Sequence, residues 1–468
     1  MQDLANKDVL VIGIGRRGRA ACELLRRAGA NVFAVDNADN ETLRETAQQL
    51  RADGIQVELG VATLPLRKFE LAVVSPAIPA PSPFFELLAQ RKVPVIGELE
   101  LGFQQAKCLS IAIAGTNGKG TTGEIVERML VNYHRKTVLA GHGARPVCSV
   151  ADQTRELDFL ILQVNSFQLE LTQKLCPTVA VLLNLTPDFL DRYPSKEHYI
   201  RAKARLFQNQ QAFDWAIVQT EALAELKKLD LLPPSKIITF SSTDQNSDIY
   251  LDRGLIISRL GNWSGPLLDM DQCQLHSSHN AENFMAALAV GHALRLPLET
   301  MVDTLKSQPP APHRFELVAE MDDVQFINDS KATNVDALRN ALLAARAGEG
   351  GRPNIWLIAG GKDKGLDFHE VSPLISKRVR GAFLIGEARE KIRSSWSLFT
   401  PCTLSDSLLE AITEAAKNAA PGDVVLLSPA CSSFDQFQNY QERGEKFYAA
   451  VKSISRGGPK GNPNISGK

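Results

Sequence analysis

One segment, Ile111–Thr122, constrains the fold of this chain more than any other. It reads IAIAGTNGKGTT, so a run of apolar and β-branched residues leads into a glycine-rich turn with one lysine, Lys119. Glycines let backbone N–H groups approach phosphate oxygens, the start of the following helix favours negative charge, and the lysine can reach the β- and γ-phosphates. The segment therefore predicts a strand, a phosphate-binding loop and a helix, in a chain that uses a nucleoside triphosphate.

The spacing within this loop differs from the common G-x-x-x-x-G-K-S/T pattern. Gly115 and Gly118 lie too close together for that pattern, and Gly120 follows the lysine where a Mg²⁺-binding hydroxyl is usual. Thr121 can supply this hydroxyl if the loop shifts by one residue. The loop is therefore stronger evidence for binding a triphosphate than for cleaving it.

Composition excludes several classes of protein. The 468 residues suggest about three domains. A formal net charge of −1 gives no support to a nucleic-acid or membrane partner. The seven cysteines are scattered without a C-x-x-C pair, which argues against a zinc site or disulfides and suits a reducing compartment. The N-terminus lacks the apolar core of a signal peptide. We therefore expect a cytoplasmic protein. We also expect a monomer, although no feature of the composition determines this.

A second glycine turn lies near the N-terminus. An apolar strand at 8–15 enters a G-x-G-x-x-G turn at Gly13, Gly15 and Gly18, and Asp36 follows the next strand, where an acid suits a ribose hydroxyl. The turn is consistent with a nicotinamide cofactor or with a Rossmann-like half-domain that has a tight turn. We favour the second interpretation because the loop at 115 explains the chain better.

The remaining sequence predicts an α/β fold with mainly parallel sheets. Apolar strands alternate with helical patterns, as in βαβ units, and the stretch Gln308–Pro312 resembles a stiff linker. The last region predicts strands at 324–328, 354–359, 382–385 and 424–427. We place domains at 1–103, 104–307 and 308–455, followed by a disordered tail at 456–468.

Several separated segments together resemble the Mur ligase family, within it most closely the branch that adds D-glutamate. No segment is decisive alone, but their order and spacing cover nearly the whole chain. The segments are AGTNGK (114–119), SFQLE (166–170), LNLTPD (183–188), LDRY (190–193), HNAEN (279–283), PHRFE (312–316), INDSKATN (327–334), GGKDKG (360–365) and LLSPACSSFDQF (426–437).

This resemblance implies three domains: a Rossmann-like N-terminal domain, a central P-loop ATPase-like domain and a Rossmann-like C-terminal domain. It also implies an amide ligase that joins D-glutamate to UDP-N-acetylmuramoyl-L-alanine in peptidoglycan precursor synthesis. ATP would phosphorylate the substrate carboxylate to an acyl phosphate, which the amine then attacks, with Mg²⁺ as cofactor. Such a site must offset the charge of several anions with N–H groups, Lys/Arg and metal.

The same resemblance assigns roles to individual residues. Catalysis falls to Lys119, Lys203 and Arg314, where Lys203 matches a carbamylated lysine of the family. ATP binding falls to Gly115, Thr116, Asn117, Gly118, Lys119, Gly120, Thr121, Asn280, Asn283, Arg314 and Asp329. D-Glutamate binding falls to Lys331, Thr333, Lys364, Ser433 and Tyr440. The residues implied to bind the UDP part of the substrate are Gly15, Arg16, Asp36 and Asn37. Metal binding falls to Thr121, Gln163 and Lys203.

The departures from the family pattern gather on the metal side of the central domain. Gly120 replaces a hydroxyl residue, Gln163 a metal-binding glutamate and Phe189 a metal-binding histidine. Asn165 replaces a serine and His142 an asparagine. Mg²⁺ prefers charged oxygen ligands, and one lost electrostatic contact typically costs ~10²–10³ in rate.

Three interpretations remain open at this point. The first is a working D-glutamate ligase. The second is a catalytically weakened relative that binds nucleotide or precursor without efficient turnover. The third is a different amide ligase, such as a relative of folylpolyglutamate synthase, whose loop has the same Gly-Thr-Asn-Gly-Lys-Gly sequence; the C-terminal motifs argue against it.

Overall fold

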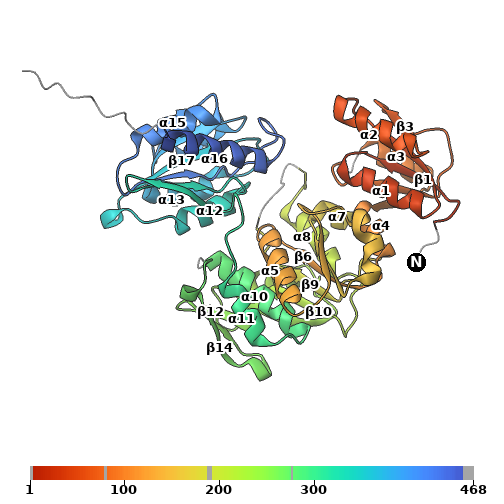
Figure 1. Ribbon diagram of the computed structural model, residues 1–468, viewed down its shortest axis with the longest axis horizontal. Coiled ribbons are helices and arrows are strands. Elements are labelled where there is room, and N and C mark those ends of the chain that lie inside the picture. Colours follow the sequence, from red (N-terminus) through yellow and green to blue (C-terminus); the bar gives the residue numbers. More distant parts are fainter. Residues whose placement is uncertain (1–3, 79–81, 187–191, 276–277, 457–468) are drawn as a thin grey trace, which may run out of the picture. The chain divides into compact units, whose positions relative to one another are not determined.

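The computed structural model describes residues 4–78, 82–186, 192–275 and 278–456 (Figure 1). They form two compact units, the first within Met1–Leu185 and Arg192–Gln308 and the second within Pro309–Lys468. Both units are α/β structures with helices packed on mainly parallel sheets, as the sequence predicts. None of the helices in the described ranges combines the length and hydrophobicity that crossing a bilayer requires.

The first sheet has five parallel strands in the order β3-β2-β1-β4-β5. Its central strand β1 is buried almost throughout, because the run Val9–Ile12 is apolar on both faces. The elements are β1 (Asp8–Ile12), α1 (Arg16–Arg27), β2 (Asn31–Asp36), α2 (Glu41–Ala52), β3 (Gln56–Leu59), β4 (Leu71–Val74), α3 (Pro83–Gln90), β5 (Val95–Gly97) and α4 (Glu98–Gln105).

The second sheet has nine strands in the order β14-β13-β12-β11-β10-β9-β6-β8-β7. Strands β6 to β12 run parallel, and β13 and β14 add an antiparallel edge. The elements are β6 (Leu109–Ala114), α5 (Lys119–Asn132), β7 (Thr137–Gly141), α6 (Val147–Val150), β8 (Phe159–Gln163), α7 (Ser166–Glu170), β9 (Val179–Leu182), α8 (Lys196–Ala204), β10 (Trp215–Gln219), α9 (Thr220–Lys228), β11 (Lys236–Ser241), β12 (Ile249–Asp252), β13 (Leu255–Ser258), β14 (Gly265–Asp269), α10 (Ser278–Ala293) and α11 (Leu298–Lys306).

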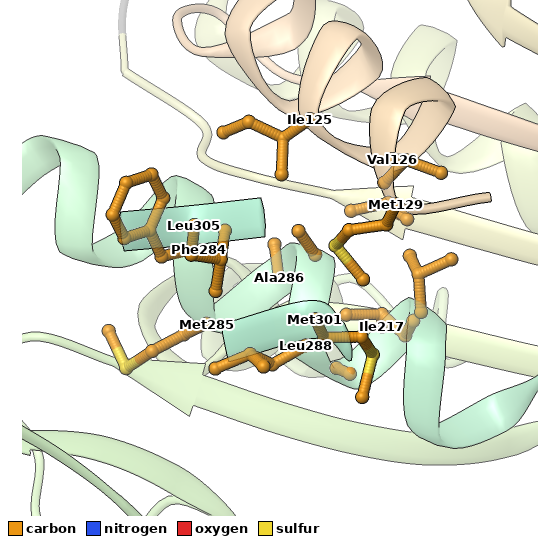
Figure 2. Close-up of a cluster of buried hydrophobic side chains, with 14 of the residues drawn as sticks. Ile125, Val126, Met129, Ile217, Phe284, Met285, Ala286, Leu288, Met301 and Leu305 are labelled. Carbon is orange, nitrogen blue, oxygen red and sulfur yellow. The ribbon is translucent and has the colours of Figure 1, made fainter. Parts of the chain in front are cut away.

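Helix α5 is held on this sheet by a buried apolar cluster (Figure 2). Met129 of α5 and Met301 of α11 lie in the same cluster as Phe284 of α10, and all three side chains are buried. A Cβ at Gly291 of α10 would lie 1.9 Å from the sulfur of Met301, so the glycine lets the two helices approach closely. This packing holds α5, which begins where the glycine-rich loop ends, against its neighbouring helices.

The third sheet lies in the second unit and has six strands in the order β15-β16-β20-β17-β18-β19. All pairs are parallel except β15 with β16. The elements are β15 (Glu316–Met321), β16 (Val324–Asn328), α12 (Val335–Ala344), β17 (Ile355–Gly360), α13 (Ser372–Arg378), β18 (Val379–Ile385), α14 (Arg389–Trp396), β19 (Cys402–Leu404), α15 (Leu408–Asn418), β20 (Val424–Leu427) and α16 (Tyr440–Arg456).

We propose that the three sheets mark the three domains expected from the sequence. The boundary expected at 103/104 falls within α4, whose Glu98 is buried and accepts a hydrogen bond from the backbone of Cys148 at 2.7 Å. The boundary expected at 307/308 lies just after α11. Of the tail at 456–468, all but its first residue lies outside the described part of the chain.

The turn between β1 and α1 generates a stability prediction. A Cβ at Gly18 would lie 1.8 Å from the carbonyl oxygen of Gly13, whereas a Cβ at Gly15 would meet nothing within 4 Å. We expect Gly18→Ala to lower the free energy of unfolding by about 2–4 kcal/mol, because backbone must move to relieve the clash. Gly15→Ala should cost under about 1 kcal/mol. Urea unfolding of the two variants measures the difference, and equal losses would contradict it.

Candidate functional site

The glycine-rich loop connects β6 to α5 in the way the sequence predicts. Helix α5 begins at Lys119, directly after Gly118. Gly118 has φ 83°, and a Cβ there would lie 2.3 Å from Oδ1 of Asn283. Only glycine adopts this conformation in this space without strain. The loop and the start of α10 therefore lie against each other.

The side chain of Asn184, two residues after the end of β9, braces this loop. Its Oδ1 accepts hydrogen bonds from the backbone N–H groups of Thr116 at 2.8 Å and Asn117 at 2.9 Å. Its Nδ2 donates to the carbonyl of Asn117 at 3.3 Å. The ammonium of Lys119 donates to the carbonyls of Gly115 at 2.8 Å and Thr116 at 2.9 Å. Hydrogen bonds made by the side chains of Asn184 and Lys119 therefore hold the loop in this conformation.

Asn184 belongs to the LNLTPD segment, but no role was predicted for it. A sequence signal could have identified it. Asn184 comes two residues after β9, which pairs with the loop strand β6, and parallel neighbours bring their carboxyl ends together.

The start of α10 contributes the two asparagines predicted to contact adenine. Asn283 is 5% exposed, and its Oδ1 accepts a hydrogen bond from the hydroxyl of Thr122 at 3.1 Å. Its Nδ2 donates weakly to Oδ1 of Asn280 at 3.4 Å. The structure thus brings the asparagine pair and the glycine-rich loop together, although the base contact itself stays a prediction.

The predicted metal side lies at the carboxyl ends of β8 and β7. Gln163, the last residue of β8, is buried, and its Nε2 lies 3.2 Å from the position of a Cβ at Gly123 of α5. The backbone carbonyl of Gln163 accepts a hydrogen bond from the backbone N–H of His142 at 2.7 Å. A neutral amide therefore lies between α5 and the turn after β7.

The contacts of Asn165 determine which nitrogen of the His142 ring carries its proton. Asn165 caps α7, and its Oδ1 accepts a hydrogen bond from the backbone N–H of Gln168 at 2.9 Å. Its amide nitrogen therefore faces Nδ1 of His142 at 3.1 Å and must donate to it. Nδ1 is then an acceptor, and the neutral ring holds its proton on Nε2.

Lys203 of α8 is buried, as a functional lysine would be. It is 1% exposed, and its ammonium lies 4.8 Å from the centre of the Tyr199 ring. The Tyr199 hydroxyl is 2.9 Å from the hydroxyl of Thr116 in the loop. The Tyr199 side chain therefore contacts both Lys203 and the glycine-rich loop.

Two of the predicted metal residues offer neutral oxygen atoms to a metal ion. Within the described ranges, no three His, Cys, Asp or Glu side chains gather in a group that could hold a metal ion. Thr121 and Gln163 offer neutral oxygens, which suit a Mg²⁺ ion that keeps water and phosphate ligands. Phe189, predicted to replace a metal-binding histidine, lies outside the described residues.

The predicted UDP site lies at the end of β2 and the start of α1. Asp36 is 8% exposed, and its carboxylate accepts hydrogen bonds from the backbone N–H groups of Ile14 at 2.8 Å and Ala38 at 3.0 Å. It therefore ties together the two turns that contain Gly15, Arg16 and Asn37. The carboxylate has a structural function there in addition to any ligand contact.

In the second unit, the predicted D-glutamate residues surround the loop after β16. Lys331 lies 3.9 Å from the centre of the Tyr440 ring. Lys364 is 7% exposed and Ser433 is 2% exposed, and Thr333 is partly exposed two residues after Lys331. The loop itself is fixed by Asn328, whose Nδ2 lies 2.9 Å from Nδ1 of His313 and donates to the carbonyl of Gly444.

Asp329, the predicted ribose residue, is deeply buried in this loop. Burial raises its pKa to about 7, although the hydroxyl of Ser428 at 3.0 Å and the backbone N–H of Phe315 at 3.1 Å act in the opposite direction. The positive charge of Arg314, predicted to reach the γ-phosphate, also lowers the pKa of this carboxyl. A buried carboxyl with a pKa near neutrality is a frequent feature of functional sites.

These sheets and the braced glycine-rich loop define the class of the protein. It is a multi-sheet α/β protein with a phosphate-loop type of strand, turn and helix at the carboxyl edge of its central sheet. The family model of the Mur ligase middle domain matches residues 113–291, and that of the Mur ligase, glutamate ligase domain matches residues 313–431.

Relatives that align with nearly the whole chain establish its family. The UDP-N-acetylmuramoylalanine–D-glutamate ligase of Acidobacterium capsulatum is 39% identical over 451 residues, which cover 95% of this chain and 96% of that protein. The protein of the same name from Geobacter sp. (strain M21) is 35% identical over 97% of this chain and 99% of its own length. The chain belongs to the Mur ligase family.

Solved structures agree with this fold. The MurF ligase of Thermotoga maritima in complex with ADP aligns with a TM-score of 0.60 at 16% identity, over 97% of this chain and 100% of that one. The UDP-N-acetylmuramate–alanine ligase MurC of Thermotoga maritima aligns with a TM-score of 0.59 at 16% identity, over 96% and 100%. At this identity the likeness bears on the fold alone.

The bracing of the loop by Asn184 leads to a binding prediction. Asn184→Ala removes the acceptor of two loop N–H groups, each worth about 1 kcal/mol, so ATP affinity should fall by roughly 30-fold. Asn184→Asp should reduce it further, because it adds negative charge and sets an oxygen against the carbonyl of Asn117. Calorimetric titration with ATP measures both variants. Asn246→Ala, in an exposed turn, is the control, and wild-type affinity in Asn184→Ala would contradict the prediction.

The buried Asp329 leads to a pH prediction. Its pKa is raised on folding from 3.8 to about 7, so the fold favours the protonated form. This contribution to stability is fully present below pH ~3.8 and is lost as the pH rises through 7. The side chain in Asp329→Asn does not titrate. The free energy of unfolding of this variant, relative to that of the wild type, should therefore rise by roughly 2–4 kcal/mol as the pH increases from 4 to 8. Urea unfolding across this range measures the effect; the exposed Asp406→Asn should show no such trend.

Proposed function

We propose that this protein is an ATP-dependent ligase that joins D-glutamate to UDP-N-acetylmuramoyl-L-alanine in peptidoglycan precursor synthesis. The observation that carries the proposal is the braced glycine-rich loop, in which Gly118, Asn184 and Lys119 fix a strand–turn–helix of the kind that binds phosphates. The names of the relatives, at 33–39% identity over nearly the whole chain, support the same activity.

The proposed nucleotide site uses the loop residues with the first turn of α5. The backbone N–H groups at the start of α5 and the ammonium of Lys119 would offset the charge of the triphosphate. Asn280 and Asn283 would contact adenine. Arg314 would reach the γ-phosphate, and Asp329 would accept a hydrogen bond from the ribose.

Two bond exchanges make up the proposed reaction. A carboxylate oxygen of UDP-N-acetylmuramoyl-L-alanine forms a bond to the γ-phosphorus as the bond from that phosphorus to the bridging oxygen breaks and ADP leaves. The amine nitrogen of D-glutamate then forms a bond to the carbonyl carbon, phosphate leaves and the nitrogen loses a proton. Both steps bring anions together, so positioning and charge compensation carry most of the catalysis.

Mg²⁺ would enter this site with ATP and neutralise part of the triphosphate charge. Thr121 and Gln163 would supply neutral oxygens to it. Lys203, buried beside Tyr199, would act from the same side of the loop, as a lysine or as its carbamate.

The other substrates would occupy opposite ends of the chain. Gly15, Arg16, Asp36 and Asn37 would bind the UDP part at the N-terminal sheet. In the second unit, D-glutamate would be held by Lys331, Thr333, Lys364, Ser433 and Tyr440, a set of cationic and hydroxyl donors that suits a small dianion. We further propose that the protein acts in the cytoplasm as a monomer.

A phosphate-release assay tests this function. With UDP-N-acetylmuramoyl-L-alanine, D-glutamate, ATP and Mg²⁺, the purified protein should release phosphate, and Lys119→Ala should lower the rate by at least ~100-fold. Omission of D-glutamate should abolish amide formation. Release no faster than that of Lys119→Ala would refute the proposal.

The departures at Gly120, Gln163 and Phe189 favour a second outcome of the same assay, in which ATP binds by calorimetry but turnover is slow. The combined substitution Gly120→Thr, Gln163→Glu and Phe189→His should then raise the rate. Fast turnover before these changes would exclude the weakened alternative.

A further inference from the structure

Arg443 of α16 is the largest cation that the second unit buries completely. It is 0% exposed, and its guanidinium donates three hydrogen bonds to two loops. Nε donates to the hydroxyl of Ser330 at 3.0 Å, and Nη2 donates to the carbonyl of Ser330 at 2.8 Å and to that of Cys431 at 3.1 Å. One side chain therefore joins the loop after β16 to the loop after β20.

The charge of this side chain is incompletely compensated. Nη1 of Arg443 is buried and makes no hydrogen bond to any described residue, and the other nitrogens donate to a hydroxyl and two carbonyls rather than to a carboxylate. Burial lowers its pKa to about 10, against the opposing effect of Cys431, Asp435 and Asp329. Burying a cation without a paired anion is costly, so such a residue calls for a functional explanation.

The segments that Arg443 holds are those that carry the proposed D-glutamate residues. Ser330 precedes Lys331, and its hydroxyl donates to the carbonyl of Tyr440 at 2.8 Å. Cys431 lies two residues before Ser433. Nη1 lies 3.2 Å from the position of a Cβ at Gly361, three residues before Lys364. A displacement of Arg443 would therefore move the backbone of all these segments together.

We propose that Arg443 is a positioning residue of the D-glutamate site, which holds these three segments in register and supplies a buried positive charge that favours an amino acid with two carboxylates over one with a single carboxylate. This inference rests on the proposed function. Arg443 is too buried to touch the ligand. It acts by holding Ser330, Cys431 and their neighbours in place, and through the electrostatic field of its positive charge.

Two substitutions separate the charge of Arg443 from its shape. Arg443→Met removes the charge and keeps a side chain of similar length. Arg443→Lys keeps the charge but loses the planar guanidinium with its several N–H donors. Arg378→Met is the matched control, because Arg378 donates to the carbonyls of Ala345 at 2.6 Å and Arg346 at 3.1 Å and also has a buried nitrogen without a partner. It lies at the end of α13 and contacts none of the proposed ligand segments.

Steady-state kinetics on the full chain, with D-glutamate or D-glutamine as acceptor, give the first readout. We expect Arg443→Met to raise the KM for D-glutamate roughly 30-fold while the KM for ATP changes less than about threefold. Its preference for D-glutamate over D-glutamine should shrink by a similar factor. Arg443→Lys should recover most of the loss, and Arg378→Met should leave both KM values and the preference unchanged.

Thermal unfolding with and without D-glutamate gives a readout that needs no turnover. D-Glutamate should raise the Tm of the wild type and of Arg378→Met but not that of Arg443→Met. If Arg443→Met loses stability yet keeps the wild-type KM and preference, the residue is structural and the inference is wrong. If the wild type shows neither D-glutamate-dependent turnover nor a Tm shift, the proposed function fails and the inference fails with it.

Discussion

The parallel arrangement of β9, β6, β8 and β7 is the constraint on which the central site depends. Parallel neighbours end at one edge, so the residues that follow them meet there although they lie far apart in the sequence. The glycine-rich loop follows β6, Asn184 follows β9, Gln163 ends β8 and His142 follows β7. The conformation of the loop and its bracing by Asn184 both follow from this edge.

The sequence predicted those parts of the molecule that short-range chemistry determines. The strands Val324–Asn328 and Val424–Leu427 lie where their apolar runs placed them, and the loop from Gly115 to Lys119 followed from the needs of a tight strand-to-helix turn. The antiparallel strands β13 and β14 carry no comparable signal, because each is short and half exposed. Asn184 and Arg443 were missed because their partners lie 67 and 113 residues away, where no local pattern reports a contact.

Charge is handled differently in the two units. At the central edge the buried Gln163 takes the place of a charged family residue, while the ammonium of Lys203 is buried against the Tyr199 ring. In the second unit a guanidinium is buried with part of its donors unused, and a neighbouring carboxyl, Asp329, has its pKa raised to about 7. The buried positive charge of Arg443 leaves an electrostatic cost that a nearby anion would reduce.

The cap of α7 also limits what the His142 ring can do. Because Oδ1 of Asn165 is committed to the helix, the lone pair of Nδ1 is already used, and the proton of the neutral ring occupies the other nitrogen. Coordination of a metal ion through Nε2 would therefore require the ring to move its proton to Nδ1 and to break the contact with Asn165.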